Sequence, residues 1–303
     1  MTIAITGATG FVGAALLDRT LAAGTGVRAL TRRPQAQREG VSWIAGDLAD
    51  RQALADLVRG AGAVIHVAGV VSAPDRDGFE RGNVAGTRAV VEAARAQGVR
   101  RFVHVSSLSA REPQLSLYGA SKARAEVAVA ASGLDWTTIR PPAIYGPRDK
   151  DMLDLFRAAR RGVVPVPADG RASMIHVDDL ARLLLALAER SDGETLGACH
   201  EPDDGVPGGW SHRELAHAIG EAVGRRVRVI GLPPRVMNLA ARIDEALRGP
   251  KAKLTRDRAA YLAHPDWVCD PAAAVPRAIW RPTIETRAGL AATAAWYRGQ
   301  GWL

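Results

Sequence analysis

Short apolar runs alternate with amphipathic stretches along the first half of the chain. The apolar runs, rich in Val, Ile and Ala, predict β-strands at residues 2–6, 27–31, 41–45, 63–67, 101–106 and 135–140. The stretches between them carry apolar residues at helical spacing and predict α-helices at 11–23, 51–59, 83–97 and 117–132. Strands that alternate with helices at this pace form βαβ units. The pattern therefore predicts an α/β fold with a doubly wound parallel sheet and helices on both faces.

The pattern changes after Pro147, where helical spacing becomes dominant. Helices are predicted at residues 152–161, 179–190, 211–223, 234–247 and 287–298. Short strands and proline-rich links interrupt them, notably at 163–167 and 201–209. We predict a sheet domain over residues 1–147 and a smaller, mostly helical lobe over residues 148–303, with residues 172–190 returning to the sheet.

A net charge of +8 raises the possibility of a nucleic-acid partner. The basic residues are mostly arginines scattered among Asp and Glu, without a basic tail or interleaved aromatic residues. This distribution favours a solvated surface that attracts small anionic molecules, and we expect no nucleic-acid partner.

Two cysteines, Cys199 and Cys269, lie far apart and form no metal-binding pattern, which is typical of a protein from a reducing compartment. The longest apolar run, residues 60–74, contains His66 and is too short to span a bilayer. A strand is predicted from Thr2 onward, which leaves no room for a signal peptide. We expect a cytoplasmic protein without a membrane partner.

Three glycines at three-residue spacing, Gly7, Gly10 and Gly13, join the first strand to the first helix. Such a turn presents backbone N–H groups and a helix N-terminus to an anion. Gly7 permits a tight turn, Gly10 lets a pyrophosphate approach the backbone, and Gly13 lets the helix pack closely on the strand. The alternative is an ordinary helix start, as found in any α/β protein.

Tyr118 and Lys122 lie four residues apart on a predicted helix, so the phenol and the ammonium share one face. A nearby cation favours the phenolate and lets a tyrosine exchange a proton near neutrality. Ser107 follows the fifth strand and could hydrogen-bond a substrate oxygen. The alternative is a pair of unrelated residues on a surface helix.

Seven motifs occur together and in order, at residues 6–13, 64–68, 83–87, 105–107, 118–122, 140–147 and 175–181. This combination resembles the extended short-chain dehydrogenase/reductase superfamily, the NAD(P)-dependent epimerase/dehydratase group. The resemblance covers residues 2 to about 181. It implies a Rossmann-type cofactor domain, a mostly helical substrate lobe and an oxidoreductase or epimerase activity.

Within this resemblance Tyr118 is the general acid/base, Lys122 lowers the pKa of Tyr118 and holds the nicotinamide ribose, and Ser107 polarises the substrate oxygen. Tyr118 and Lys122 thus also contact the cofactor. The other implied cofactor residues are Gly7, Thr9, Gly10, Phe11 and Val12 at the pyrophosphate, Asp47 and Leu48 at the adenine, Val67, Ala68 and Gly69 beneath the ribose, and Pro141, Pro142, Ala143 and Ile144 beside the nicotinamide.

The residues after the second strand bear on the choice of cofactor. In doubly wound folds an acidic residue there accepts hydrogen bonds from the ribose 2′-hydroxyl and repels a 2′-phosphate. This chain has Thr31, Arg32 and Arg33, and its next acidic residue is Glu39. Guanidinium groups suit a phosphate, so we predict NADP(H) in preference to NAD(H). The alternative is a solvated basic turn that ignores the cofactor.

His176, Asp178 and Asp179 could suggest a metal site. No further ligand with defined spacing accompanies them, and Asp179 is well placed to cap the helix that follows. We predict a structural role for these residues and no bound metal.

The chain departs from the nucleotide-sugar members of the superfamily. Residues 108–112 and 170–174 lack the usual tyrosine and arginine patterns, and only ten residues separate Ser107 from Tyr118. We therefore predict an NADP(H)-dependent oxidoreductase acting on a carbonyl or secondary alcohol of a small molecule. A nucleotide-sugar epimerase or dehydratase with tightly bound NAD(P), and a non-catalytic NAD(P)-binding regulatory or assembly subunit, remain alternatives. The resemblance also leaves open a homodimer formed through helices 83–97 and 117–132.

Overall fold

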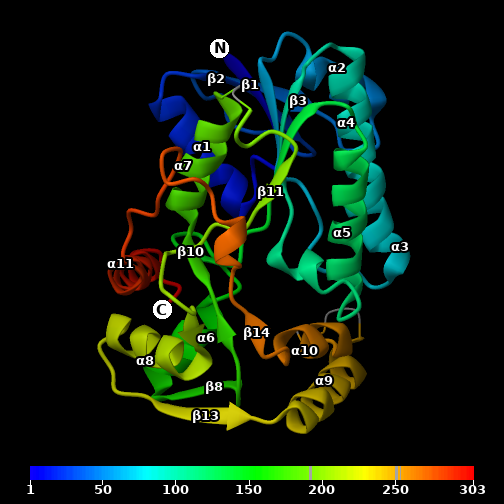
Figure 1. The fold of residues 1–303 in the computed structure, drawn as a ribbon. Coiled ribbons are helices and arrows are strands. Elements are labelled where there is room, and N and C mark those ends of the chain that lie inside the picture. Colours follow the sequence, from blue (N-terminus) through cyan, green and yellow to red (C-terminus); the bar gives the residue numbers. More distant parts are fainter. Residues whose placement is uncertain (191–192, 250–251, 253) are drawn as a thin grey trace. The chain divides into compact units, whose positions relative to one another are not determined.

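The computed structural model describes residues 1–190, 193–249, 252 and 254–303 (Figure 1). The chain forms two compact units. The first unit contains Met1–Pro141, Asp178–Pro202 and Ala273–Arg281; the second contains Pro142–Val177, Asp203–Ala272 and Pro282–Leu303. The first segment of the first unit thus ends at Pro141, whereas we predicted a boundary at residue 147. Two later segments of the chain also belong to this unit.

A seven-stranded, all-parallel sheet forms the centre of the first unit, with the strand order β11-β6-β5-β4-β1-β2-β3. The strands are β1 (Thr2–Thr6), β2 (Gly26–Thr31), β3 (Val41–Ala45), β4 (Ala63–His66), β5 (Arg101–Val105), β6 (Asp135–Ile139) and β11 (Ala198–His200). The six strands predicted from apolar runs are all present, which confirms the predicted α/β class. The seventh, β11, is only three residues long and gave no apolar signal.

Helices cover both faces of this sheet (Figure 1). They are α1 (Phe11–Ala22), α2 (Arg51–Val58), α3 (Arg76–Phe79), α4 (Gly86–Ala96), α5 (Leu117–Ala130) and α7 (Val177–Ala188). Leu54 and Leu57 of α2, Val90 of α4 and Val129 of α5 pack with Phe102 of β5 in one buried cluster. Burial of these apolar side chains is the main stabilising contribution to this unit.

The helix predicted to begin at residue 83 begins earlier. A π-helical segment, Glu80–Ala85, joins α3 directly to α4, so helical structure runs without a break from Arg76 to Ala96. Gly78 and Gly82 lower the helical signal of this stretch in the sequence. π-helical turns are rare and are frequently found at functional sites.

The strand order reverses between β1 and β4, whose partners run outward in opposite directions along the sheet. In doubly wound sheets the ligand-binding crevice lies outside the carboxyl ends of the strands at such a point. Here those ends lead into the Gly7 turn and into residues 67–69. The topology therefore brings two of the predicted cofactor segments to the same edge.

Residues 172–190 divide between the units. The strand β10 (Met174–His176) pairs with β7 (Ala143–Tyr145) in a separate two-stranded sheet, so it does not join the seven-stranded one. The return to the first unit is made by α7 from Asp178 onward, and β11 then pairs with β6. We expected Asp179 to be the N-cap of this helix. Because α7 begins at Val177, Asp179 instead lies in its first turn.

The second unit is built from short sheets and helices around an aromatic core. Besides β7 and β10 it contains α6 (Leu153–Arg161), β8 (Val163–Pro167), β9 (Arg171–Ala172), β12 (Trp210–Ser211), α8 (His212–Ala222), β13 (Arg228–Leu232), α9 (Pro234–Arg248), α10 (Arg256–Leu262), β14 (Asp266–Trp267) and α11 (Thr286–Gly299). Phe156 of α6 packs edge-on against Tyr297 of α11, with ring centroids 5.2 Å apart. Throughout the described ranges of the chain, no helix is both long and apolar enough to cross a membrane.

Candidate active site

The turn between β1 and α1 can be built only with glycine at two positions. Gly7 has φ +74°, and a Cβ atom there would lie 2.8 Å from the backbone nitrogen of Ala68. A Cβ atom on Gly13 would lie 2.0 Å from the carbonyl oxygen of Gly7. The turn is thus packed tightly against both the following helix and the loop after β4.

The N-terminus of α1 is suited to an anion. Its N-cap residue, Gly10, has no side chain with which to cap the first turn, and that turn carries no acidic residue. Thr9 and Gly10 are exposed, and Phe11 and Val12 are half-buried. Backbone N–H groups at such a terminus can donate hydrogen bonds to phosphate oxygens, so this part of the chain fits the pyrophosphate of a dinucleotide.

A buried histidine links the glycine turn to the loop after β4. Thr6 Oγ1 lies 2.7 Å from His66 Nδ1, and His66 Nε2 lies 3.0 Å from Thr87 Oγ1. The Thr87 hydroxyl donates to the carbonyl of Asn83, so we assign the imidazole proton to Nε2. Thr6 then donates to Nδ1 and accepts from the backbone N–H of Ala68 at 3.1 Å, which fixes residues 67–69 beside the turn.

Asn83, in the π-helical segment, ties this loop to α5. Its side chain accepts from the N–H of Val70 and donates to the carbonyl of Val70 and to Ser121 Oγ, at 2.8, 3.0 and 2.8 Å. Ser121 in turn donates to the carbonyl of Tyr118. Asn83 was not among the predicted site residues, and its place in the motif at residues 83–87 was the available signal for this role.

Ser116 is the N-cap of α5, and its hydroxyl accepts the N–H of Gly119 at 2.9 Å. Tyr118 is half-buried, and its ring centroid lies 6.2 Å from that of Phe79. Lys122 is 5% exposed, and its ammonium donates to the carbonyl of Val105 at 2.7 Å. Lys122 is therefore not a surface residue.

Burial sets the charge balance around Lys122. It lowers the pKa of the Lys122 ammonium to about 8, and the negative charge of Glu126 opposes this shift. The pKa of His66 falls to about 3, first because of burial and second because of the positive charge of Lys122. His104, stacked on His66 at 5.8 Å, has a pKa well below 6.5 for the same reasons. Lys122 thus has two neutral imidazoles as neighbours.

The two serines after β5 differ in their contacts. Ser107 Oγ accepts from the N–H of Ser109 at 3.2 Å and from its hydroxyl at 2.9 Å. Both contacts use Ser107 as acceptor, which leaves its own O–H to donate to a substrate oxygen. Ser106 instead donates to Glu126 Oε1 at 2.5 Å. The Ser106 hydroxyl is thus already used within the protein, and the role of Ser107 as the substrate-facing serine stays a prediction.

Glu126 connects α5 to the end of β6. Arg140 donates to its two carboxylate oxygens at 2.9 and 2.6 Å, and Arg140 lies 3.6 Å from Glu201. Arg111 approaches the same Glu201 at 3.5 Å. The paired carboxylate raises the pKa of Arg140. Sequence analysis missed this network, whose members come from four separate segments of the first unit.

The residues predicted to choose between the cofactors lie after β2. Thr31 donates to the carbonyl of Arg33 at 2.7 Å and accepts from its N–H at 3.3 Å, which shapes the turn. The side chains of Arg32 and Arg33 are exposed, and no ion pair ties either of them to the described residues. Their guanidinium groups are therefore available to an anion.

The remaining predicted cofactor residues differ in their surroundings. Asp47 is exposed and accepts the N–H of Ala49, whereas Leu48 packs against the apolar cluster of the first unit. The carbonyl of Pro141, in the first unit, accepts the N–H of Leu108 at 3.0 Å. Pro142, Ala143 and Ile144 belong to the second unit.

The residues considered for a metal have other contacts. His176 packs edge-on against Tyr145 at 5.1 Å, and Asp179 pairs with Arg182 at 2.7 Å. Over the described ranges, no group of three or more His, Cys, Asp or Glu residues is arranged to hold a metal ion.

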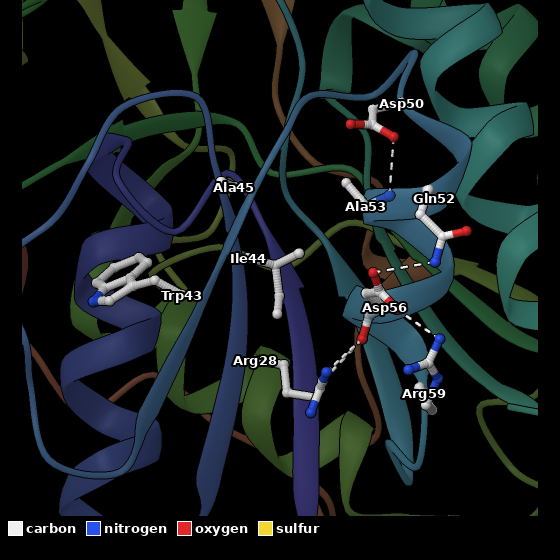
Figure 2. A pocket seen from close by; sticks show the side chains of 9 residues that line it. All are labelled: Arg28, Trp43, Ile44, Ala45, Asp50, Gln52, Ala53, Asp56 and Arg59. Carbon is white, nitrogen blue, oxygen red and sulfur yellow. Dashed lines mark hydrogen bonds and ion pairs between the residues drawn. The ribbon is translucent and has the colours of Figure 1, made fainter.

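A depression on the first unit, between β3 and α2, does not coincide with the predicted site (Figure 2). Its lining residues are Arg28, Trp43, Ile44, Ala45, Asp50, Gln52, Ala53, Asp56 and Arg59. Several of its polar groups bond to one another. Arg28 donates to the carbonyl of Asp56 at 2.6 Å, and Arg59 pairs with the Asp56 carboxylate at 2.6 Å. We assign it no ligand.

The strand order, the glycine turn and the Tyr118–Lys122 pair together agree with one family. The model of the NAD dependent epimerase/dehydratase family matches residues 3–198. The chain belongs to this family. Its members bind NAD(P), and the chain is accordingly an NAD(P)-dependent enzyme of the short-chain dehydrogenase/reductase type, as the resemblance implied.

Two relatives that cover most of this chain are named as reductases. The chain is 40% identical to "Ceramide reductase" of Caulobacter vibrioides, over 99% of this chain and 96% of that protein. It is 32% identical to "2-alkyl-3-oxoalkanoate reductase" of Stenotrophomonas maltophilia, over 88% of this chain and 91% of that protein. Among solved structures, MoeE5 in complex with UDP-glucose and NAD superposes with a TM-score of 0.75 at 24% identity, covering 99% of both chains. That last similarity shows the fold alone.

Proposed function

We propose that the protein is an NADP(H)-dependent reductase that converts a ketone to a secondary alcohol, with Tyr118 as the proton donor. The observation that carries the proposal is the position of Lys122, one helical turn after Tyr118, buried and bonded to the end of β5. A buried ammonium has to be offset by a function or a partner, because burial alone favours its neutral form. Stabilising a phenolate and binding a ribose hydroxyl would use this cation.

The residues of the candidate site have distinct roles in the proposed reaction. A nicotinamide cofactor, when bound, would supply the hydride for the carbonyl carbon. Ser107 donates a hydrogen bond to the carbonyl oxygen, and Tyr118 gives that oxygen its proton as negative charge develops on it. Lys122 stabilises the phenolate that remains on Tyr118. Asn83 and Ser121 hold the start of α5 and the loop after β4 in register.

The relatives indicate the substrate class. One is named for a 2-alkyl-3-oxoalkanoate, a 3-oxo acid with an alkyl branch beside the oxo group, and the other is named for ceramide. Both names describe molecules that carry alkyl chains, and ceramide is a lipid. We propose a ketone carried on a long-chain, lipid-like molecule as the substrate of this enzyme, in preference to a nucleotide sugar.

Substitution of Tyr118 by Phe tests the proposed chemistry. The ring still packs against Phe79, so cofactor binding should be unchanged, while turnover of a 2-alkyl-3-oxoalkanoate with NADPH should fall by about 10² or more. Phe79→Leu removes the ring contact but no proton donor and serves as the control. Equal turnover of Tyr118→Phe and the parent enzyme would overturn the assignment. Hydride returned to substrate with no net NADPH consumption would favour the epimerase alternative.

Titration calorimetry with NADPH and NADH tests the cofactor preference. A partly desolvated phosphate–arginine contact contributes about 2 kcal/mol, or about thirtyfold in affinity. Arg32→Ala and Arg33→Ala should narrow the gap between the two cofactors, and Arg38→Ala, which removes an arginine already paired with Asp18, should not. Equal affinity for both cofactors in the parent protein would contradict NADP(H) preference.

A further inference from the structure

The helix α9 carries a row of large apolar side chains on its outer face. Val236, Leu239, Ile243 and Leu247 follow one another at intervals of three, four and four residues, which places them on one side of the helix. They are 47, 59, 51 and 80% exposed. We refer to these four residues as the apolar stripe.

The opposite face of α9 is already packed. Met237 and Ala241 are buried. Asp244 accepts the N–H of Leu254, and Glu245 accepts the N–H of Arg256 at the start of α10. The helix is thus held to its own unit by its inner face, and packing inside that unit does not account for the apolar stripe.

The charges on α9 are sorted around the stripe. Its two acidic residues are neutralised, Asp244 by Arg248 at 3.2 Å and Glu245 by Arg256 at 3.0 Å. Arg235 and Arg242, seven residues apart, line one edge of the stripe and are exposed. Neither forms an ion pair with any residue in the described segments. The outer face therefore presents apolar side chains beside unpaired cations.

A helix with this arrangement matches the interface of an anionic bilayer. Apolar side chains can enter the boundary between headgroups and acyl chains, while flanking arginines extend to the phosphates. Basic residues near an anionic leaflet add electrostatic attraction that a neutral surface does not provide. A net charge of +8 acts in the same direction.

We propose that the outer face of α9 docks the protein on the surface of an anionic phospholipid bilayer. The apolar runs of the sequence are too short to span a bilayer, and on that ground we expected no membrane partner. The apolar stripe instead indicates peripheral binding. This proposal does not depend on the reaction catalysed, because docking is measured without substrate or cofactor. Its failure would leave the proposed reductase activity intact.

Cosedimentation with vesicles tests the proposal. The parent protein should bind vesicles of phosphatidylcholine mixed with phosphatidylglycerol, and bind vesicles of phosphatidylcholine alone at least tenfold more weakly. Binding should also weaken as salt is added. Absence of binding to the anionic vesicles, or equal binding to both kinds, would overturn the proposal.

Paired variants locate the contact. Leu239→Gln with Leu247→Gln should lower the partition coefficient by roughly a hundredfold, since two large side chains no longer enter the apolar layer. Arg235→Gln with Arg242→Gln should lower it by about thirtyfold. The controls are Val127→Gln, which changes an equally exposed apolar residue of α5, and Arg213→Gln on α8. A loss of the same size in the controls would contradict a contact through α9.

Sedimentation velocity distinguishes the rival occupant, a second copy of the chain. A dimer that dissociates in the Leu239→Gln, Leu247→Gln variant, together with no vesicle binding by the parent, would show that the apolar stripe is a protein interface. That result would overturn the proposal. A parent protein whose mass is independent of the stripe, and which binds anionic vesicles, would support it.

Discussion

The helices α5 and α9 are nearly equal in length and carry their key residues at the same spacing. On α5 these residues face the interior of the unit, and on α9 they face outward. On α5, Tyr118, Lys122 and Glu126 follow one another at four-residue intervals, and Lys122 and Glu126 are held by contacts within the first unit. On α9, Leu239, Ile243 and Leu247 have the same interval and are exposed. Periodicity therefore identifies a helix face, and the surrounding chain decides whether that face holds reactive groups or meets a partner.

The largest expected loss of stability comes from breaking the ion pair between Glu126 of α5 and Arg140. Glu126→Gln leaves Arg140 without a full counter-charge at a mostly buried position, so the free energy of unfolding should fall by about 3 kcal/mol. The control is Glu80→Gln, which disrupts the exposed pair with Arg124 of the same helix and should cost less than about 1 kcal/mol. Urea unfolding measures both variants. Equal losses would show that Glu126 is no more important than a surface carboxylate.

Lys122→Met separates function from stability on α5. Met fills a similar space without a charge, so turnover should fall by about 10² and NADPH should bind more weakly. The unfolding temperature should not fall, because a buried ammonium that favours its neutral form is removed. Arg124→Met on the same helix should leave turnover unchanged. Parallel losses of turnover and stability would indicate a structural role only.

His104, near Lys122, should make the stability of the first unit depend on pH. Burial holds the pKa of His104 well below 6.5, so the unfolded chain takes up a proton there as pH falls below 6.5 while the native protein does not. This lowers the free energy of unfolding by about 1.4 kcal/mol per pH unit for that residue. His104→Leu should remove this contribution, and unfolding measured at several acidic pH values should show a shallower decline. The exposed His217→Leu is the control; an unchanged slope in His104→Leu would contradict the assignment.

The smallest expected effect concerns α9 itself. Leu239→Gln with Leu247→Gln should change the free energy of unfolding by no more than about 0.5 kcal/mol, because both side chains are already exposed. Met237→Gln, on the buried face of the same helix, should cost about 2 kcal/mol or more. A large loss in the first variant would mean that the apolar stripe is part of the folded core.

The two helices also show how far sequence can predict this molecule. Tyr118 and Lys122 could be proposed as a reactive pair from the sequence because the proposed chemistry requires a fixed local spacing, and their role stays a prediction. Glu126 could not, because a carboxylate at a helical interval usually lies on a surface; its burial comes from Arg140 and Glu201, which the fold brings from other segments.

What the sequence could not predict about α9 and β11 depends, in both cases, on contacts with other segments of the chain. The apolar spacing predicted α9 at 234–247, but which face would be buried depends on α10, a short helix that the pattern missed. The short strand β11 is stabilised by pairing with β6, a long-range contact that leaves little trace in local composition. The other six strands of the central sheet were predictable because each is rich in apolar, aromatic or β-branched residues.

The π-helical segment at residues 80–85 limits how this protein can be redesigned. Such a segment is a regular helix with one residue inserted, so a designer seeking an ideal helix from α3 to α4 would delete that residue. Deletion of Val84 or Ala85, between Asn83 and α4, would turn the Asn83 side chain by about 100° relative to α4, since each residue advances an α-helix by that angle. The bonds from Asn83 to Val70 and Ser121 would then be lost. A gain in helical regularity here would come at the cost of the register between two functional segments, which makes the irregular turn a poor target for stabilisation.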